Sequence, residues 1–264
     1  MGLLSGKKGL VLNIANDRSI AAHIGKRAAG EGAEVGMGFL QIGDSVEKSE
    51  RRARRGMEEH GFTGWLALCD VSKDESIEQF FATAKEKFGT IDFVVHSLAF
   101  ADKNYLSTKE GVFTSTPREV FRQALDISAY SLIALARAAV PLMPNGGSII
   151  GLTYLGSEKA VPGYNIMGVA KAALESASRY LAYDLGPKKI RVNTISAGPI
   201  KTLAASAVGD LDEMLAHAAR KAPLKRNIDA DEVAKTAVYL LSDLSSGVTG
   251  ENLFVDAGFN TVGL

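Results

Sequence analysis

The sequence predicts an α/β fold of the doubly wound type, with a seven-stranded parallel sheet and helices on both of its faces. Seven short apolar runs rich in Val, Ile and Leu recur along the chain, and amphipathic stretches of helical period separate the first six. Strands buried on both faces give such continuous apolar runs, and consecutive parallel strands need helical crossovers. The runs are KGLVLNI, AEVGMGFL, GWLALCD, IDFVVHSL, GSIIGL, IRVNTI and ENLFVD.

Residues 1–264 are predicted to form a single domain. The length suits one large α/β domain, and no charge run or Pro/Gly/Ser-rich linker divides the chain. In open sheets of this kind, ligands bind beyond the carboxyl ends of the strands, near the point where strand order reverses. Polar and small residues cluster after the first six runs, which indicates a Rossmann-like fold with a ligand site at these strand ends.

The composition argues against several classes of partner. Lys plus Arg and Asp plus Glu both total 30, so no overall field recruits nucleic acid or an anionic membrane. No stretch is expected to be long and apolar enough to span a bilayer, so no membrane insertion is predicted. The balanced charge favours a small partner. The first apolar run ends at Asn13 and no small-residue cleavage site follows it, so no leader is expected and a cytoplasmic protein is predicted.

The cysteine and the histidines give no sign of a metal site. Cys69, the lone cysteine, lies in WLALCD, where a buried and inert thiol is expected. The histidines lack the spacing of metal ligands, so no metal is predicted. They are His23, His60, His96 and His217.

After the first strand, a turn leads into a helix that Ser19 opens and that ends near residues 30–32. A helix N-terminus presents free backbone N–H groups and the positive end of the helix dipole, which suit a pyrophosphate. The motif G-x-G-x-x-G is absent, so an ordinary turn with Ser19 as N-cap is an equal alternative.

The ends of the second and third strands suit the adenosine half of a dinucleotide. Gln41 stands where such a site meets the ribose; it is neutral and no basic residue adjoins it, which favours NADH over NADPH. The run RRARR at 51–55 lies among glutamates and is predicted to be a solvated helix face. Asp70 and Val71 close the third strand, where a carboxylate can accept from the adenine amino group and the next backbone N–H can donate to the ring. The alternative is that Asp70 only starts a turn.

The stretch TYLGSEKAVPGYNIMGVAK, residues 153–171, follows the fifth strand. A helix is predicted from about 163 to 184, because Pro and Gly precede a run of helical period. Tyr164 and Lys171 would then share one face, with the lysine stem reaching back toward the tyrosine. A nearby ammonium favours negative charge on its neighbours, so the phenol is predicted to be an oxyanion partner. Taken without the other strand ends, a core aromatic and a surface charge would be the better interpretation.

A substrate-binding loop is expected at about residues 200–225, after the sixth strand. The segment TLAASAVGDLDEMLAHAARKAPL mixes small and apolar residues, as loops that close over substrates commonly do. Tyr154 and Met167 are expected to face the same cavity, with an ordinary core position as the alternative for Met167.

Together these residues resemble the short-chain dehydrogenase/reductases, and among them the bacterial enoyl-[acyl-carrier-protein] reductases of type II fatty acid synthesis. The resemblance runs from SGKKGLVLNIANDRSIA through CDV, VHSLAFAD, DISAYS, TYLGSEKAVPGYNIMGVAKAALE and RVNTISAGPIKTLAAS to SSGVTGENLFVDAG. Common short-chain dehydrogenases carry Y-x3-K, with a serine thirteen positions before the tyrosine. Here the spacing is Y-x6-K, Gly151 stands at the upstream position, and Tyr154 precedes Tyr164 by ten residues, as in the enoyl reductases.

The resemblance implies roles for individual positions. Tyr164 would be the catalytic tyrosine and Lys171 would bind the cofactor ribose beside it, with Tyr154 as a further member of the catalytic group. Ala101, Tyr154, Tyr164 and Met167 would line the acyl pocket. The other implied cofactor contacts are Asn13, Ser19 and Ile20 after the first strand, Gln41, Asp70 and Val71 on the adenosine side, Leu98 along the cofactor, and Ile200, Lys201, Thr202, Leu203 and Ala204 at the nicotinamide end.

One position departs from the family pattern. Where the family usually has glycine at the end of the first strand, this chain has Asn13. Glycine lets the backbone approach the adenosine closely, whereas asparagine tolerates positive φ but must place its side chain. Weaker cofactor binding than in the glycine form is therefore expected.

The implied reaction is reduction of a trans-2-enoyl thioester, carried on acyl carrier protein or coenzyme A, with NADH preferred and NADPH as the alternative cofactor. Hydride passes to the β-carbon, and charge develops on the thioester oxygen. A 3-oxoacyl ketoreductase of the same fold is one rival, against which the Y-x6-K spacing counts. A non-catalytic NAD(H)-binding sensor is another, which Asn13 alone suggests. The family also implies a homotetramer packed through two long helices and the C-terminal region.

Overall fold

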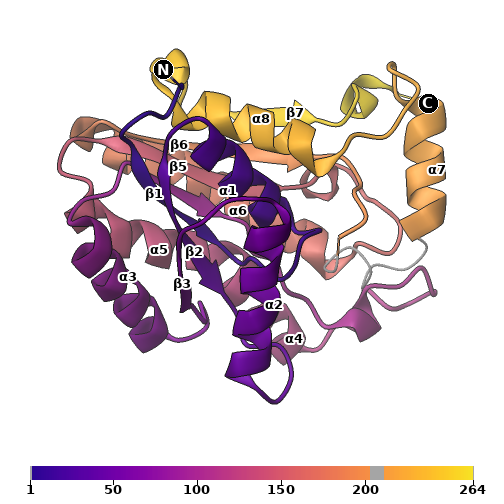
Figure 1. The fold of residues 1–264 in the computed structure, drawn as a ribbon. Helices are drawn as coiled ribbons and strands as arrows, with labels where there is room; N and C mark the ends of the chain where they lie inside the picture. The colour runs from indigo at the N-terminus through magenta and orange to yellow at the C-terminus, as the bar shows by residue number, and fades with distance from the viewer. Residues whose placement is uncertain (1, 203–210, 264) are drawn as a thin grey trace.

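The computed structural model describes residues 2–202 and 211–263, and its core is one sheet of seven parallel strands (Figure 1). The strands are β1 (Lys8–Leu12), β2 (Glu34–Phe39), β3 (Trp65–Leu68), β4 (Phe93–His96), β5 (Gly147–Thr153), β6 (Ile190–Ala197) and β7 (Asn252–Val255). Each coincides with one of the seven apolar runs, so the predicted fold class is confirmed.

The strand order is β3-β2-β1-β4-β5-β6-β7. The chain moves outward from β1 to β3 and then returns to place β4 on the other side of β1. Strand order therefore reverses between β1 and β4, which is where a doubly wound sheet opens a crevice for a ligand.

Helices cover both faces of the sheet (Figure 1). The helices are α1 (Ile20–Gly30), α2 (Val46–Glu59) and α8 (Ala230–Leu241) on one face, and α3 (Asp74–Phe88), α5 (Ser131–Ala139) and α6 (Ile166–Leu185) on the other, with α4 (Arg118–Leu125) against α6 and α7 (Leu211–Lys221) after the sixth strand.

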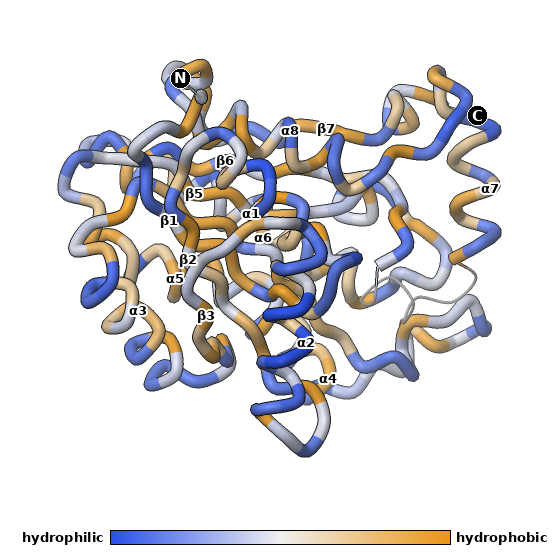
Figure 2. Tube along the Cα trace, viewed as in Figure 1, coloured by the Kyte–Doolittle hydropathy of each residue, from blue (hydrophilic) through white to orange (hydrophobic). Residues whose placement is uncertain are grey.

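Successive side chains of each strand contribute alternately to two apolar cores, one under each helix layer. Val11 joins the core beneath α1 and α8, whereas Leu10 and Leu12 join the core beneath α3 and α5. Successive strand side chains point to opposite faces, which explains the split. Figure 2 shows hydrophobic residues concentrated along the central strands and hydrophilic residues on the outer turns of α2 and α3.

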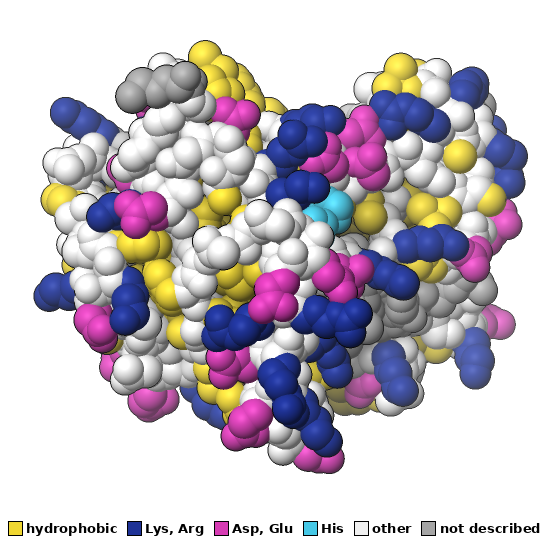
Figure 3. Space-filling view, viewed as in Figure 1, with side chains coloured by type: hydrophobic (Ala, Val, Ile, Leu, Met, Phe, Trp, Pro, Cys, Tyr) yellow, Lys and Arg dark blue, Asp and Glu magenta, His cyan; other side chains and the backbone are white. Residues whose placement is uncertain are grey.

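The arginine-rich run forms an exposed face of α2. Arg54 pairs with Glu50 at 2.7 Å and Arg55 pairs with Glu59 at 2.6 Å, each one helical turn apart. Figure 3 shows basic and acidic side chains together over this helix. The prediction of a solvated helix face is confirmed.

Cys69 is buried just after β3. Burial, and then the neighbouring Asp70, raise the pKa of its thiol to about 12. Because the thiolate is the reactive form, this cysteine is inert near neutral pH, as the sequence predicted.

The expectation that no segment is apolar and long enough to span a membrane is wrong. The helical run Arg118–Leu142, which includes α4, a π-helical turn and α5, passes that test, because an 18-residue window within it has a mean hydropathy of 1.4. Half of its apolar window is buried inside the protein, where α5 packs on α3 and α4 packs on α6. A helix buried in a protein core and a helix that spans a membrane are both rich in alanine and leucine. Composition alone therefore does not distinguish these two kinds of helix.

Candidate active site

The carboxyl ends of β1, β4, β5 and β6 surround a cavity of about 560 Å³. Residues singled out in the sequence line it: Ile20, Ala101, Tyr154, Tyr164, Met167, Ile200 and Thr202. They come from segments far apart in the chain. The fold therefore gathers, at the reversal of strand order, groups expected at a dinucleotide and acyl site.

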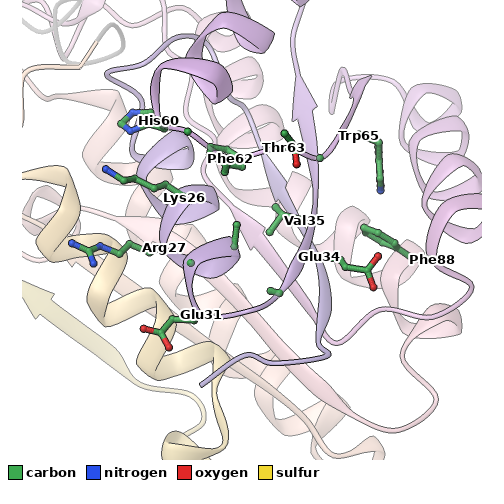
Figure 4. A pocket seen from close by; sticks show the side chains of 15 residues that line it. Lys26, Arg27, Glu31, Glu34, Val35, His60, Phe62, Thr63, Trp65 and Phe88 are labelled. Carbon is green, nitrogen blue, oxygen red and sulfur yellow. The ribbon is translucent and has the colours of Figure 1, made fainter. Parts of the chain in front are cut away.

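A larger hollow of about 820 Å³ opens at the opposite edge of the sheet (Figure 4). It lies by the amino ends of β2 and β3, with Lys26, Arg27 and Glu31 on one side and Trp65 and Phe88 on the other. Arg27 is already engaged in an ion pair with α8. Because parallel sheets bind ligands at the carboxyl ends of their strands, the smaller cavity is the candidate active site.

Tyr164 lies in a turn just before α6. The predicted helix started at about residue 163, whereas α6 begins at Ile166. Gly163 has φ 78° and Asn165 has φ 43°, and neither angle belongs to a right-handed helix. The prediction that Tyr164 and Lys171 share a helix is therefore wrong, because the tyrosine is presented by a tight turn at the helix N-terminus.

The ring of Tyr164 has close neighbours on two sides. A Cβ on Gly156 would lie 2.3 Å from a ring carbon of Tyr164, and one on Gly168 would lie 2.5 Å from the carbonyl oxygen of Gly156. The ring of Tyr154 packs against that of Tyr164, with centroids 4.8 Å apart and planes at 60°. Only glycine leaves room for this arrangement, so the position of the phenol is tightly defined.

Both tyrosines stay protonated near neutral pH. Burial, followed by Tyr154 and Glu175, raises the pKa of Tyr164. Burial, followed by Asp256, raises the pKa of Tyr154 to about 12. The sequence predicted a phenol held ready to donate a hydrogen bond to an oxyanion, and a neutral phenol fits that role, although burial rather than a neighbouring cation sets its protonation. Tyr164 is therefore a neutral hydrogen-bond donor.

Lys171 lies on α6 and is only 4% exposed. Its Nζ donates to the carbonyl oxygen of Leu152 at 2.7 Å and to that of Leu98 at 3.1 Å. Burial lowers the pKa of Lys171 to about 8, although Glu175 acts in the opposite direction. An ammonium has three N–H donors, so in the described part of the chain one is left for a ligand. Leu98 is itself buried and meets the lysine through its backbone.

Glu175, one helical turn after Lys171, escaped the sequence analysis. It is 7% exposed and accepts a hydrogen bond from Thr153 Oγ1 at 2.6 Å. A buried carboxylate beside a buried ammonium lowers the cost of holding the positive charge inside the protein. Its place within the motif KAALE was visible, but helical spacing alone did not distinguish it from a surface glutamate.

His96 at the end of β4 was also missed as a site residue. It is completely buried, and its Nε2 lies 2.7 Å from Ser131 Oγ. The Ser131 hydroxyl donates its hydrogen to Ile127 O at 2.6 Å, so Nε2 must be the donor to the serine. Burial, and then Lys171, lower the pKa of His96 to about 3, which keeps the imidazole neutral beside the ammonium.

Asn13 adopts the left-handed conformation expected at this position, with φ 70°. Its Nδ2 donates to the carbonyl oxygen of Ser97 at 3.0 Å, across the reversal between β1 and β4. The side chain is therefore fixed at the junction of the two strand ends, where glycine would leave open space.

We expect Asn13→Gly to lower the dissociation constant for NADH severalfold. Glycine adopts φ 70° freely and removes the side chain from the cofactor side of β1. Loss of the bond to Ser97 should cost about 1 kcal/mol of unfolding free energy. Fluorescence titration with NADH and thermal melting measure the two effects separately, and an unchanged or higher dissociation constant would contradict the expectation.

Ser19 stands at the N-cap of α1, but its side chain does not cap the helix. Its hydroxyl instead donates to the carbonyl oxygen of Asn16, within the turn after β1. The first backbone N–H groups of α1 therefore point toward the reversal point without a side-chain cap, as an anion site requires. Ile20 reaches the cavity from this first turn.

The residues expected on the adenosine side lie at the ends of β2 and β3, outside the 560 Å³ cavity. Gln41 is exposed and donates from Nε2 to the carbonyl oxygen of Gly43. The carboxylate of Asp70 accepts from both the N–H and the hydroxyl of Ser72, which is the geometry of a turn starter. Burial would raise the pKa of Asp70, but hydrogen bonds from Ser72 and Lys73 outweigh it and lower the pKa. Val71 is buried beside it.

The residues after β6 divide between cavity and surface. Ile200 and Thr202 line the cavity, whereas Lys201 is exposed and pairs through Nζ with Asp212 of α7 at 2.7 Å. Leu203 and Ala204 lie outside the described residues. In the predicted substrate-binding loop, α7 supplies Leu211 and Met214 to the cavity wall.

Several lining residues were not predicted from the sequence. Phe100 and Asp102 belong to the strand end HSLAFAD, so a signal for them was present. Leu106 and Gln123 come from a loop and from α4, where no motif marks them. Only the folded chain shows that these segments close the cavity.

The family model and the similar proteins found by sequence comparison all carry the name enoyl-[acyl-carrier-protein] reductase. A family model described as Enoyl-(Acyl carrier protein) reductase matches residues 14–260. Proteins named Enoyl-[acyl-carrier-protein] reductase [NADH] FabI are 50% identical in Synechocystis, over 99% of both chains, and 50% identical in Rickettsia conorii, over 99% of this chain and 97% of that one.

Solved structures that superpose on this chain are also enoyl-acyl carrier protein reductases. The enoyl-acyl carrier protein reductase of Bacillus cereus, crystallised with NADP+ and indole naphthyridinone, superposes with a TM-score of 0.94 at 44% identity, over 100% of both chains. The reductase of Anaplasma phagocytophilum in complex with NAD superposes with a TM-score of 0.92 at 44% identity, over 100% of this chain and 98% of that one.

Proposed function

The chain belongs to the enoyl-[acyl-carrier-protein] reductase family, and from this premise we propose how its residues carry out the reduction of a trans-2-enoyl thioester with NADH. The observation that carries the proposal is a neutral, buried phenol at the wall of a cavity, with a buried ammonium on the adjoining helix. NADH, when bound, supplies the hydride that adds to the β-carbon of the substrate.

Tyr164 donates a hydrogen bond to the thioester oxygen while negative charge develops there. The turn before α6 and the packing of Gly156 fix the phenol before the substrate arrives. A donor that is already oriented stabilises developing charge without reorganising. Tyr154, in ring contact with Tyr164, closes the same wall and is a second phenol within the cavity.

The residues present fit a dinucleotide. The first turn of α1 has no side-chain cap and suits the pyrophosphate, and Lys171 retains a donor for the nicotinamide ribose. A compact ammonium with several donors suits a diol better than it suits proton transfer. Gln41 and Asp70 would meet the adenosine, and Ile200 and Thr202 the nicotinamide end.

The acyl chain occupies the cavity and its extension. A second cavity of about 760 Å³ adjoins the first and shares Tyr154, Pro199 and Met214 with it. Together they form an apolar path from the phenol toward α7 and the C-terminal residues. We assign this path to the acyl chain of a thioester on acyl carrier protein or coenzyme A, with residues 200–225 as the substrate-binding loop of a single-domain enzyme.

The test mixes purified protein with a trans-2-enoyl thioester and either NADH or NADPH, and follows the loss of reduced-nicotinamide absorbance. Faster oxidation of NADH with the enoyl substrate is expected. A 3-oxoacyl thioester in parallel tests the ketoreductase alternative, and turnover of that compound alone would overturn the assignment. Binding of NADH without turnover of either substrate would indicate a sensor.

A homotetramer in the cytoplasm completes the proposal. Exposed aromatic and aliphatic side chains gather on α4, the following π-helical turn, α5 and α6: Phe121, Tyr130, Ile133, Tyr180 and Tyr183. Large apolar side chains that face solvent on adjoining helices favour a protein interface. Light scattering should give four times the 28.0 kDa chain mass, and a mass of one chain would refute the tetramer.

A further inference from the structure

Asn165 connects the turn of Tyr164 to a different segment of the cavity wall. Its Nδ2 donates to the carbonyl oxygen of Tyr105 at 3.0 Å and to that of Ser107 at 2.9 Å. Only the NH₂ group of an amide satisfies two acceptors at once, so the orientation of this side chain is defined. The two carbonyls flank Leu106, which is therefore held from both sides.

The backbone of Asn165 is unfavourable for a residue with a side chain. Its φ of 43° and ψ of −119° lie far from the helix that begins one residue later. Glycine would adopt this conformation without strain, as Gly163 does two residues earlier with φ 78°. Strain that persists at one residue indicates that its surroundings hold it there. The two amide hydrogen bonds hold the side chain, and the carbonyl oxygen of Asn165 accepts from the N–H of Gly168 at 2.9 Å.

The tether joins two parts of the active site. Leu106, Tyr164 and Met167 belong to one buried apolar cluster, and all three line the 560 Å³ cavity. Leu106 comes from the loop after β4, whereas Tyr164 comes from the turn after β5. In the part of the chain that the structure describes, Leu106 and Tyr164 lie in no strand or helix, and the amide of Asn165 joins their two segments.

We propose that Asn165 is a positioning residue for the reductase reaction, because it holds Leu106 of the substrate cavity and the hydroxyl of Tyr164 in a fixed relation. The proposal rests on the role proposed above for Tyr164. Asn165 acts through its neighbours and donates nothing to the substrate. Its loss should lower turnover while NADH binding is little affected, because the Asn165 amide contacts Tyr105 and Ser107, which are not among the residues assigned to the cofactor.

Two variants remove the tether by different routes. Asn165→Gly relieves the strained φ and deletes the amide. Asn165→Asp keeps the shape and the tolerance for positive φ, but its carboxylate has no N–H and faces two carbonyl oxygens. Both should lower kcat for an enoyl thioester about ten- to a hundredfold, which is the range expected for a misplaced reacting group. The NADH dissociation constant should stay within about twofold of the wild-type value, because no removed contact touches the cofactor side.

A double-mutant cycle with Tyr164→Phe separates positioning from a general structural effect. In the phenylalanine background, Asn165→Gly should change kcat by no more than about twofold, since the group that it positions is gone. Lys189→Gly is the matched control, because Lys189 also has positive φ, 59°, but lies just before the amino end of β6, at the end of the strand away from the cavity. It should leave kcat unchanged.

The outcomes are distinct. Wild-type kcat in both folded Asn165 variants, or losses that multiply fully with Tyr164→Phe, would overturn the positioning role. Absence of enoyl thioester turnover in the unmodified protein would instead overturn the proposed function.

Discussion

Replacing Tyr164 by phenylalanine is expected to lower kcat for a trans-2-enoyl thioester by about two to three decades. The phenol is buried and neutral at the cavity wall, and its pKa is raised mainly by burial. Removing one preoriented donor to a developing oxyanion costs about 2.7 to 4 kcal/mol. The ring remains, so packing against Gly156 and Tyr154 should keep the fold intact.

Steady-state kinetics at saturating NADH measure this effect. Tyr239→Phe on α8 is the matched control, since it removes a phenol hydroxyl away from the cavity lining. A loss below tenfold would have two explanations, which Tyr154→Phe distinguishes. If Tyr154 substitutes as donor, the variant lacking both hydroxyls loses far more than either alone. If the double variant is no slower, the assignment of Tyr164 is refuted.

Replacing Lys171 by methionine is expected to weaken NADH binding about ten- to a hundredfold and to lower turnover with it. Hydrogen bonds from a charged donor are worth about 1.5 to 3 kcal/mol, and the ammonium would give one to the nicotinamide ribose. Methionine keeps an unbranched stem in the buried site. Fluorescence titration measures the dissociation constant, with Lys235→Met on the surface of α8 as the control. Unchanged affinity in Lys171→Met would reassign the lysine to proton transfer.

Lys171 also predicts opposite pH trends for cofactor affinity and for stability. Burial lowers its pKa to about 8 from 10.5, so the native protein releases this proton before the unfolded chain does. NADH affinity should therefore fall as pH rises through about 8. Between 8 and 10.5 the unfolded chain binds more protons, so the contribution of Lys171 to the unfolding free energy rises with pH. Both trends should vanish in Lys171→Met, and an affinity that stays flat across pH 8 in the unmodified protein would contradict the assignment.

The sequence predicted the sheet well because every strand is a continuous apolar run in a strongly periodic chain. It failed at Tyr164, where the helix starts three residues later than expected. The cause is a positive φ at Asn165, which no periodicity encodes, since asparagine is compatible with several backbone conformations. The sequence motif identified Tyr164, but only the structure shows that the residue lies in a turn.

The direction of the Tyr164 pKa shift shows a second limit of sequence reasoning. The sequence predicted the hydrogen-bond donor role of the phenol from a nearby cation. Burial decides the outcome instead, and burial depends on the whole fold. His96 and Leu106 were missed for the same reason, because their roles follow from what packs around them.

The strand order has a consequence for how the enzyme acquires its activity. Cavity residues extend from Ile20 to Met214, and neighbouring strands such as β1 and β4 are joined only by long excursions of the chain. Pairings of this kind close large loops, which makes folding slow and leaves no early local nucleus that contains the site. A nascent or truncated chain is therefore expected to be inactive. After dilution from denaturant, turnover should return only when the sheet is complete.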